Sequence, residues 1–140
     1  MNAEVFVDTN VLVYAYDNRE GYKQETAKRI LHNLSQQRTG VVSMQVLQEF
    51  YNTVTRKLAS PLPKDIARLI VDRFSLWCIE TTPLEIKRAF LIEDEARIGF
   101  WDALIVAAAI RCGATRILSE DLNPGQTIAG IQIENPFLVQ

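Results

Sequence analysis

The sequence predicts an α/β protein with a mostly parallel sheet of about five strands between layers of helices, in a three-layer α/β/α arrangement. Two observations predict this fold class. Short runs of β-branched and aromatic residues alternate along the chain with longer segments whose apolar residues recur at helical spacing. The chain has 140 residues, 48% of them hydrophobic and 23% charged, as expected for one globular domain. We therefore expect a single domain over residues 1–140, because no repeat, low-complexity segment or linker interrupts it.

The first strand and the helix after it meet at an acidic residue. Residues 5–7 are a β-branched and aromatic run, and the residues from Thr9 onward keep helical spacing. Asp8 therefore lies at the carboxyl end of a central strand, where open α/β sheets bind their ligands. Asp is also a favoured N-cap, so Asp8 could instead serve only to begin the helix. This stretch alone leaves both interpretations open.

Four further strands are expected from short apolar runs rich in β-branched residues. These runs are 41–43, 76–79, 116–119 and 131–133. Residues 122–126 combine Asn, Pro and Gly and are expected to form a loop.

The remaining helices are expected where apolar residues return every three or four positions. They run over 22–37, from Ser43 to about 59–61, from Pro63 to about 75, from the Thr82-Pro83 pair to about 96, and over 100–110. The last of these is apolar on every side except for Asp102, so we expect it to be buried in the middle of the domain. Gly113 follows its end, as is common at a helix C-terminus.

Charge and cysteine content exclude several function classes. The net charge of −2 provides no general attraction for nucleic acid, so a polyanionic partner would need a local basic surface or bound cations. Cys78 and Cys112 lie in apolar contexts without metal-ligand spacing, which favours buried thiols in a reducing cytoplasm. No apolar run approaches the roughly 20 residues that cross a membrane, and the N-terminus lacks a basic secretory n-region. The single histidine, His32, lies off the apolar stripe and is expected at the surface.

Four acids are placed where they could share one cleft. Asp8 and Asp121 follow strands whose carboxyl ends meet at one sheet edge, and Glu49 and Asp102 lie on helices that can reach the same edge. No basic residue stands beside Asp8, Asp102 or Asp121 in the sequence to neutralise them. Clustered carboxylates need an opposite charge, and a hard divalent cation such as Mg²⁺ or Mn²⁺ binds oxygen ligands of this kind. Such a site can activate water for attack on phosphorus.

The chain as a whole resembles a known family. The residues that carry the resemblance are Val-Asp-Thr-Asn at 7–10, the lone Glu49, Phe-Trp-Asp-Ala-Leu-Ile at 100–105 and Leu-Ser-Glu-Asp-Leu at 118–122. Taken together and in this order, they resemble the PIN-domain ribonucleases, and among these the bacterial VapC-type toxins. No single motif is specific, but the four span the chain from end to end.

The resemblance implies a PIN-like fold, a set of site residues and a function. Asp8, Glu49, Asp102 and Asp121 match the acidic quartet, with Asp8, Asp102 and Asp121 as ligands of Mg²⁺ or Mn²⁺, and Asn10 and Ser119 match the polar positions that support it. The adjacent Glu120 could take the place of Asp121 as the fourth acid. The implied function is a metal-dependent endoribonuclease that cleaves RNA phosphodiester bonds with metal-activated water. The implied setting is a cytoplasmic homodimer, without membrane association, that is the toxin of a toxin–antitoxin pair and binds a protein antitoxin.

Three other functions were weighed. A receiver domain would need paired acids near the first strand and a lysine after the last strand, and a haloacid-dehalogenase-type phosphatase would need Asp where Asn10 stands. Both fit less well. A catalytically inactive PIN-like module that binds RNA or a protein remains the alternative.

Several basic residues are candidate RNA contacts, although ordinary solvated charge is the more common role for each. They are Arg19, Lys23, Arg56, Lys57 and Arg97. Tyr14 and Tyr16 could stack on a base, but core packing is their more common use.

Overall fold

The computed structural model describes residues 4–138, so the predicted domain limits at residues 1 and 140 lie outside the described part. Five strands form one sheet in the order β2-β1-β3-β5-β4. All neighbouring strands pair in parallel except β4, which runs antiparallel to β5. The strands are β1 (Val5–Val7), β2 (Gly40–Val41), β3 (Arg116–Leu118), β4 (Thr127–Ile128) and β5 (Ile131–Glu134).

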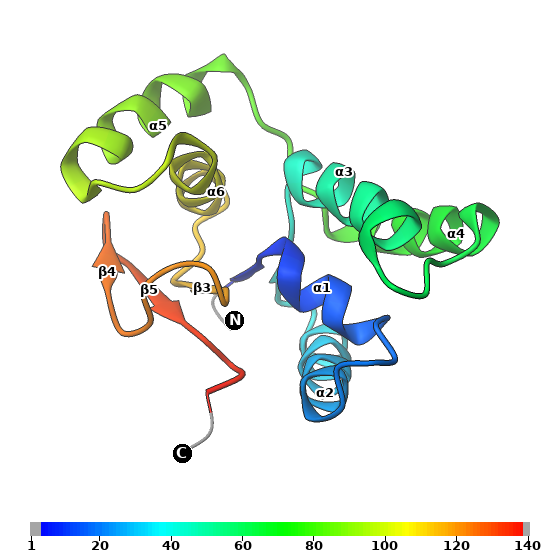
Figure 1. The fold of residues 1–140 in the computed structure, drawn as a ribbon. Coiled ribbons are helices and arrows are strands. Elements are labelled where there is room, and N and C mark those ends of the chain that lie inside the picture. The colour runs from blue at the N-terminus through cyan, green and yellow to red at the C-terminus, as the bar shows by residue number, and fades with distance from the viewer. Residues whose placement is uncertain (1–3, 139–140) are drawn as a thin grey trace.

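Helices flank this sheet and complete the three-layer fold, which confirms the predicted fold class. Helices α5 and α6 lie together on one side of β1, and α1 to α4 group on its other side (Figure 1). No helix among residues 4–138 is long and apolar enough to span a membrane. The helices are α1 (Thr9–Ala15), α2 (Tyr22–Gln37), α3 (Met44–Asn52), the π-helical turn η1 (Thr53–Lys57), α4 (Lys64–Phe74), the 3₁₀ turn η2 (Ser75–Trp77), α5 (Pro83–Ala96) and α6 (Phe100–Arg111).

Strand β1 is an inner strand of the sheet, between β2 and β3, and it sets the position of the site. All three of its residues are buried, as expected for a parallel strand covered on both faces. Val7 is opposite Leu118 of β3, so the two strands end side by side. The backbone N–H of Asp8 also donates to Leu118 O at 3.0 Å. The residues that follow β1 and β3 therefore meet at one edge of the sheet.

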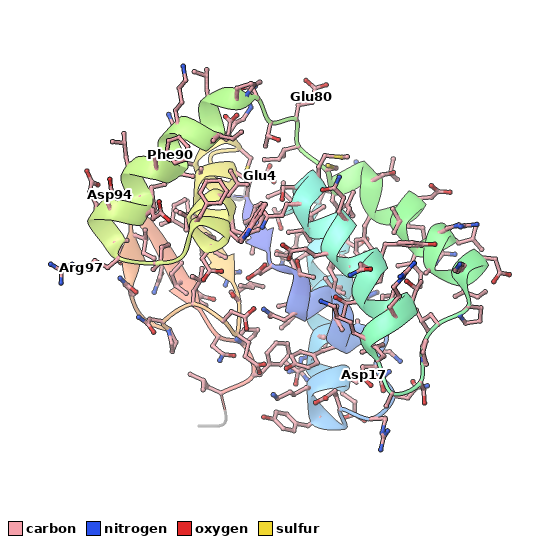
Figure 2. All side chains as sticks on the ribbon, turned by 45° about the horizontal axis from the view of Figure 1, so that its top comes forward. Glu4, Asp17, Glu80, Phe90, Asp94 and Arg97 are labelled. Atoms are coloured by element: carbon pink, nitrogen blue, oxygen red, sulfur yellow. The ribbon has the colours of Figure 1, made fainter. Side chains whose placement is uncertain are left out.

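Helix α6 is buried as the sequence predicted, apart from its first turn. Its residues 105–109 are all buried, because apolar side chains surround the helix and both neighbouring layers cover it. Trp101, in contrast, is 65% exposed. In Figure 2 the charged side chains of Glu80, Asp94 and Arg97 lie at the periphery of the molecule.

One predicted strand is wrong. Residues 76–79 form no strand, because the chain leaves α4 through the turn η2 and touches the sheet edge only at the single bridge between Val42 and Cys78. Leu76 is 88% exposed, so its apolar character reflects neither a strand nor the core.

The fifth strand is instead β4, which follows the predicted loop. It forms a hairpin with β5 across Ala129 and Gly130, whose φ angles are +51° and +84°. Two successive positive φ values are typical of a tight hairpin turn. The Ala-Gly pair is a weaker sequence pattern for this turn than Asn-Gly, which is why β4 was missed.

Candidate active site

Asp8 lies at the carboxyl end of β1, at the sheet edge, and also begins the helix α1. It is the N-cap of α1, where its Oδ1 accepts a hydrogen bond of 2.7 Å from the Thr9 N–H. Its Oδ2 accepts a hydrogen bond of 2.7 Å from the Ser119 hydroxyl. Burial raises the pKa of Asp8 to about 6 against the lowering effect of these two hydrogen bonds, and the negative Asp121 and Glu49 raise it further.

Asp121 is held at the same edge from the other strand. The amide Nδ2 of Asn10 donates to Asp121 Oδ2 at 3.0 Å, and the Asp121 N–H donates to the Ser119 hydroxyl oxygen at 3.1 Å. Ser119 therefore joins Asp8 and Asp121. Unlike Asp8, which is buried, Asp121 is exposed.

Glu120, the alternative fourth acid, points elsewhere. Its carboxylate accepts a hydrogen bond from the Tyr14 hydroxyl and one of 2.8 Å from the Lys23 ammonium. Burial alone would raise the pKa of Glu120, but the hydrogen bonds from Lys23 and Tyr14 outweigh it and lower this pKa. Burial, together with the hydrogen bond to Glu120, raises the pKa of Tyr14 to about 12. The structure thus places Glu120 in an ion pair with Lys23, whereas Asp121 lines the pocket of the candidate site.

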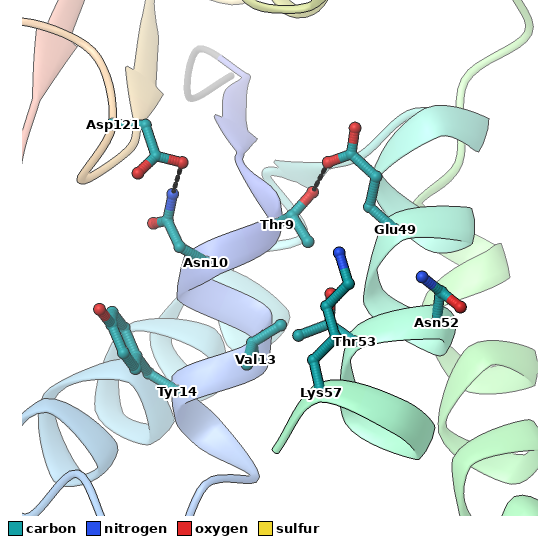
Figure 3. A pocket seen from close by; sticks show the side chains of 9 residues that line it. All are labelled: Thr9, Asn10, Val13, Tyr14, Glu49, Asn52, Thr53, Lys57 and Asp121. Carbon is teal, nitrogen blue, oxygen red and sulfur yellow. Dashed lines mark hydrogen bonds between the residues drawn. The ribbon is translucent and has the colours of Figure 1, made fainter. Parts of the chain in front are cut away.

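Glu49 reaches the same pocket from α3. Its Oε2 accepts a hydrogen bond of 2.8 Å from the Thr9 hydroxyl, and its Oε1 accepts one of 2.9 Å from Gln45. The pocket has a volume of about 460 Å³ (Figure 3). Its lining residues are Thr9, Asn10, Val13, Tyr14, Glu49, Asn52, Thr53, Lys57 and Asp121.

Asp102 lies in the first turn of α6 and is half-buried. Burial raises its pKa, and the charges of Asp121 and Glu49 raise it further. Asp102 and Asp8 thus share the influence of the same two carboxylates. The acids that follow β1 and β3 and those on α3 and α6 are therefore close enough for Glu49 and Asp121 to raise the pKa of the other two.

Comparison with known families identifies the family of this chain. Residues 5–127 match the PIN domain. The chain belongs to the PIN-domain family. The family prediction is confirmed, and it was based on residues from all parts of this matched range. A comparison with curated protein sequences finds no match.

Solved structures share the fold of this PIN domain at low sequence identity. A toxin–antitoxin complex from Klebsiella pneumoniae matches with a TM-score of 0.72 and 16% identity, over 97% of this chain and 100% of that one. VapBC2 from Rickettsia felis, bound to a promoter DNA fragment, matches with a TM-score of 0.67 and 21% identity, over 94% and 97%. Mycobacterium tuberculosis VapC20, described as a toxin that cleaves the sarcin–ricin loop, matches with a TM-score of 0.62 and 20% identity, over 84% and 90%.

The acids of this PIN domain suit a metal bound partly through water. Among the described residues, 4–138, no three His, Cys, Asp or Glu side chains form a ready metal cage. Mg²⁺, however, commonly binds through one or two carboxylates, with water and substrate phosphate oxygens completing its shell. The donors here are carboxylate oxygens, and none of the three ion pairs found among residues 4–138 neutralises Asp8, Glu49, Asp102 or Asp121. The donor set therefore fits a hard divalent cation.

Sequence reasoning missed two residues that shape this PIN-domain site. Thr9 holds Glu49, and Gln45 donates both to Glu49 and, at 3.4 Å, to the carbonyl oxygen of Trp101. Gln45 lies one helical turn before Glu49, a spacing that allows side-chain hydrogen bonds and could have indicated its role. Nothing in the sequence pairs Thr9 with Glu49, because the two are 40 positions apart.

Proposed function

We propose that this PIN domain is a divalent-metal-dependent endoribonuclease that hydrolyses RNA phosphodiester bonds, and that it acts as a VapC-type toxin. The proposal is carried by the proximity of four acids from distant parts of the chain. Glu49 and Asp121 line one pocket, and their charges raise the pKa of both Asp8 and Asp102. None of the four is ion-paired with a lysine or arginine in residues 4–138. Membership of the PIN family and the fold shared with toxin structures support the nuclease class.

The acids divide into metal ligands and a proton acceptor. Asp8, Asp102 and Asp121 would hold Mg²⁺ or Mn²⁺, directly or through water, and the ion would supply activation of water and polarisation of the phosphate. Ser119 fixes the carboxylate of Asp8, and Asn10 fixes that of Asp121.

Glu49 is exposed and oriented by Thr9 and Gln45, so it is placed to accept the proton of the attacking water. A carboxylate held by two hydrogen-bond donors keeps one geometry, which a proton acceptor requires. This assignment gives the fourth acid a role that differs from metal binding.

The partner in this proposal is a protein antitoxin. The Klebsiella structure is a toxin–antitoxin complex and the Rickettsia structure contains VapBC2, which makes an antitoxin the expected partner of this chain. A guanidinium group of the antitoxin would neutralise the exposed Glu49 and Asp121 and so close the pocket. A structure of the complex with no partner side chain near these two acids would count against this mode of inhibition.

The proposed assembly is a cytoplasmic homodimer. Three aromatic rings pack in a row: the centroid of Phe100 lies 5.9 Å from that of Phe90 and 5.2 Å from that of Trp101. Phe90 is 51% exposed. Burying such a run against a second copy would remove apolar surface from water. Light scattering of the wild type and of Phe90→Glu tests this, since the variant should be monomeric. The cytoplasmic location agrees with both cysteines being free thiols.

Cleavage of total cellular RNA tests the central proposal. We expect Mg²⁺ or Mn²⁺ to be required, EDTA to abolish cleavage, and Asp8→Asn to be inactive while keeping the circular dichroism spectrum of the wild type. Asp94→Asn, which changes an exposed acid on α5, is the matched control and should cleave normally. Cleavage that survives both chelation and Asp8→Asn would falsify the metal-nuclease proposal. A folded wild type that binds RNA but never cleaves it would favour the inactive module instead.

A further inference from the structure

The side of the pocket that faces the acids carries a lysine. Asn52, Thr53 and Lys57 line this side, and in Figure 3 the Lys57 ammonium group extends into the pocket toward Thr9 and Glu49. Lys57 is exposed, and it belongs to none of the three ion pairs found among residues 4–138. Glu49, the acid toward which Lys57 extends, is held instead by Thr9 and Gln45.

The π-helical turn at the end of α3 accounts for this orientation. Glu49 and Lys57 are eight residues apart, and η1 continues α3 without a break. An α turn takes 3.6 residues and a turn closed by i→i+5 bonds takes more than four, so one of each spans about eight residues. The wider turn therefore returns Lys57 to the face that carries Glu49. π-helical turns of this kind are frequent at functional sites.

We propose that Lys57 binds a phosphate group of the RNA backbone in this pocket, next to the acids that perform the cleavage. This inference depends on RNA being the substrate, as proposed above. An ammonium group on a flexible stem suits a phosphate, which it contacts as a point charge. The pocket volume of about 460 Å³ is in the usual range for small ligands, which leaves room for one nucleotide unit.

The charge balance of the pocket favours such a contact. The chain has a net charge of −2, and Glu49 and Asp121 both line the pocket, so an approaching RNA backbone is repelled there. Lys57 is the one basic residue among the nine that line the pocket. Arg56, also a candidate RNA contact by sequence, is exposed on the same turn but does not line the pocket. We therefore expect no phosphate contact from Arg56 there, which makes it the matched control.

Binding of RNA without cleavage provides the test. In the Asp8→Asn background and in EDTA, fluorescence anisotropy measures the Kd of a short fluorescein-labelled single-stranded RNA of mixed sequence between about 50 and 200 mM salt. Lys57→Gln should weaken binding by about 3- to 10-fold at the lowest salt and reduce the slope of log Kd against log salt by about 0.7, the value for one phosphate contact on a single strand. Lys57→Arg should restore most of the affinity, and Arg56→Gln should change neither quantity.

The outcomes separate this inference from the proposed function. An unchanged Kd and slope for Lys57→Gln, or equal effects of Lys57→Gln and Arg56→Gln, would overturn the phosphate contact even if the wild type cleaves RNA. A reduced slope for Lys57→Gln alone supports the contact even if no cleavage is found. If none of the variants binds the RNA, the phosphate contact is overturned, whereas the proposed function stands or falls with the cleavage assay in Mg²⁺ or Mn²⁺.

Discussion

The hydroxyl of Ser119 donates a hydrogen bond of 2.7 Å to Oδ2 of Asp8, although the two residues are 111 positions apart in the sequence. Both residues are buried at the ends of neighbouring parallel strands. The same hydroxyl oxygen accepts the N–H of Asp121. One serine thus orients the carboxylate of Asp8 and holds the backbone of Asp121 beside it.

Replacing this serine should destabilise the protein. In Ser119→Ala a buried carboxylate oxygen loses its donor, and an unsatisfied buried group costs about 1–3 kcal/mol. Urea unfolding at neutral pH should show a lower midpoint with an unchanged m-value. Ser60→Ala, in an exposed bend, is the control and should leave the midpoint unchanged. An unchanged midpoint for Ser119→Ala would mean that water replaces the hydroxyl without loss.

The two adjacent acids after β3 should differ in their effect on cleavage. Asp121→Asn removes a proposed metal ligand, whose contribution of several kcal/mol corresponds to a loss of about 100-fold or more in rate. Glu120→Gln should leave the cleavage rate unchanged, because its carboxylate contacts Lys23 and Tyr14 instead of the pocket. Glu120→Gln should instead lower the unfolding free energy by about 1 kcal/mol at most, since the ion pair is partly exposed. The reverse pattern of rates would exchange the roles of the two acids.

Glu85 should make the free energy of unfolding depend on pH in the acidic range. Hydrogen bonds from the Thr82 backbone and hydroxyl and from Arg111 lower the pKa of Glu85 from 4.5 to about 2. A lowered folded-state pKa means that the stabilisation is complete above pH 4.5 and is lost as the pH falls toward 2.

Thermal melting across this pH range checks whether the stabilisation by Glu85 is lost as the pH falls. The melting temperature of Glu85→Gln should be below that of the wild type at pH 7, and the two should converge between pH 4.5 and 2. Glu95→Gln, an exposed acid on the same helix, should show no such convergence. A difference between Glu85→Gln and wild type that stays constant through acid would show that Glu85 stabilises only through its uncharged contacts.

Gly40 should not tolerate a side chain. A Cβ atom at this position would lie 2.5 Å from the ring of Trp77, which packs edge-on against Phe74 with centroids 5.1 Å apart. Gly40→Ala should therefore destabilise the protein by about 1–3 kcal/mol, the usual cost of overpacking. Calorimetry of Gly40→Ala, Trp77→Leu and the double variant tests the cause. The double variant should be more stable than the sum of the two single effects predicts. If the two effects simply add, contact with the Trp77 ring is not the cause.

Much of the fold could be predicted because its cause is local. The buried run of β1, the helical spacing of α2 and the Thr82-Pro83 start of α5 each depend on neighbouring residues, and all three elements form where they were expected. The strand predicted at 76–79 shows the limit of this reasoning. An apolar run becomes a strand only if a sheet edge pairs with it over its length, and here only Cys78 pairs.

Part of the candidate site could likewise be predicted from the sequence, and part depended on the tertiary structure. The sequence by itself determined that Asp8 and Asp121 follow predicted strands and that Asp102 begins a helix, and the family resemblance completed the set of candidates with Glu49. Only the tertiary structure decided that Glu120 pairs with Lys23, and that Lys57 extends into the pocket. The physical reason is that the direction of a charged side chain depends on its partners, and these come from strands and helices up to 111 positions away.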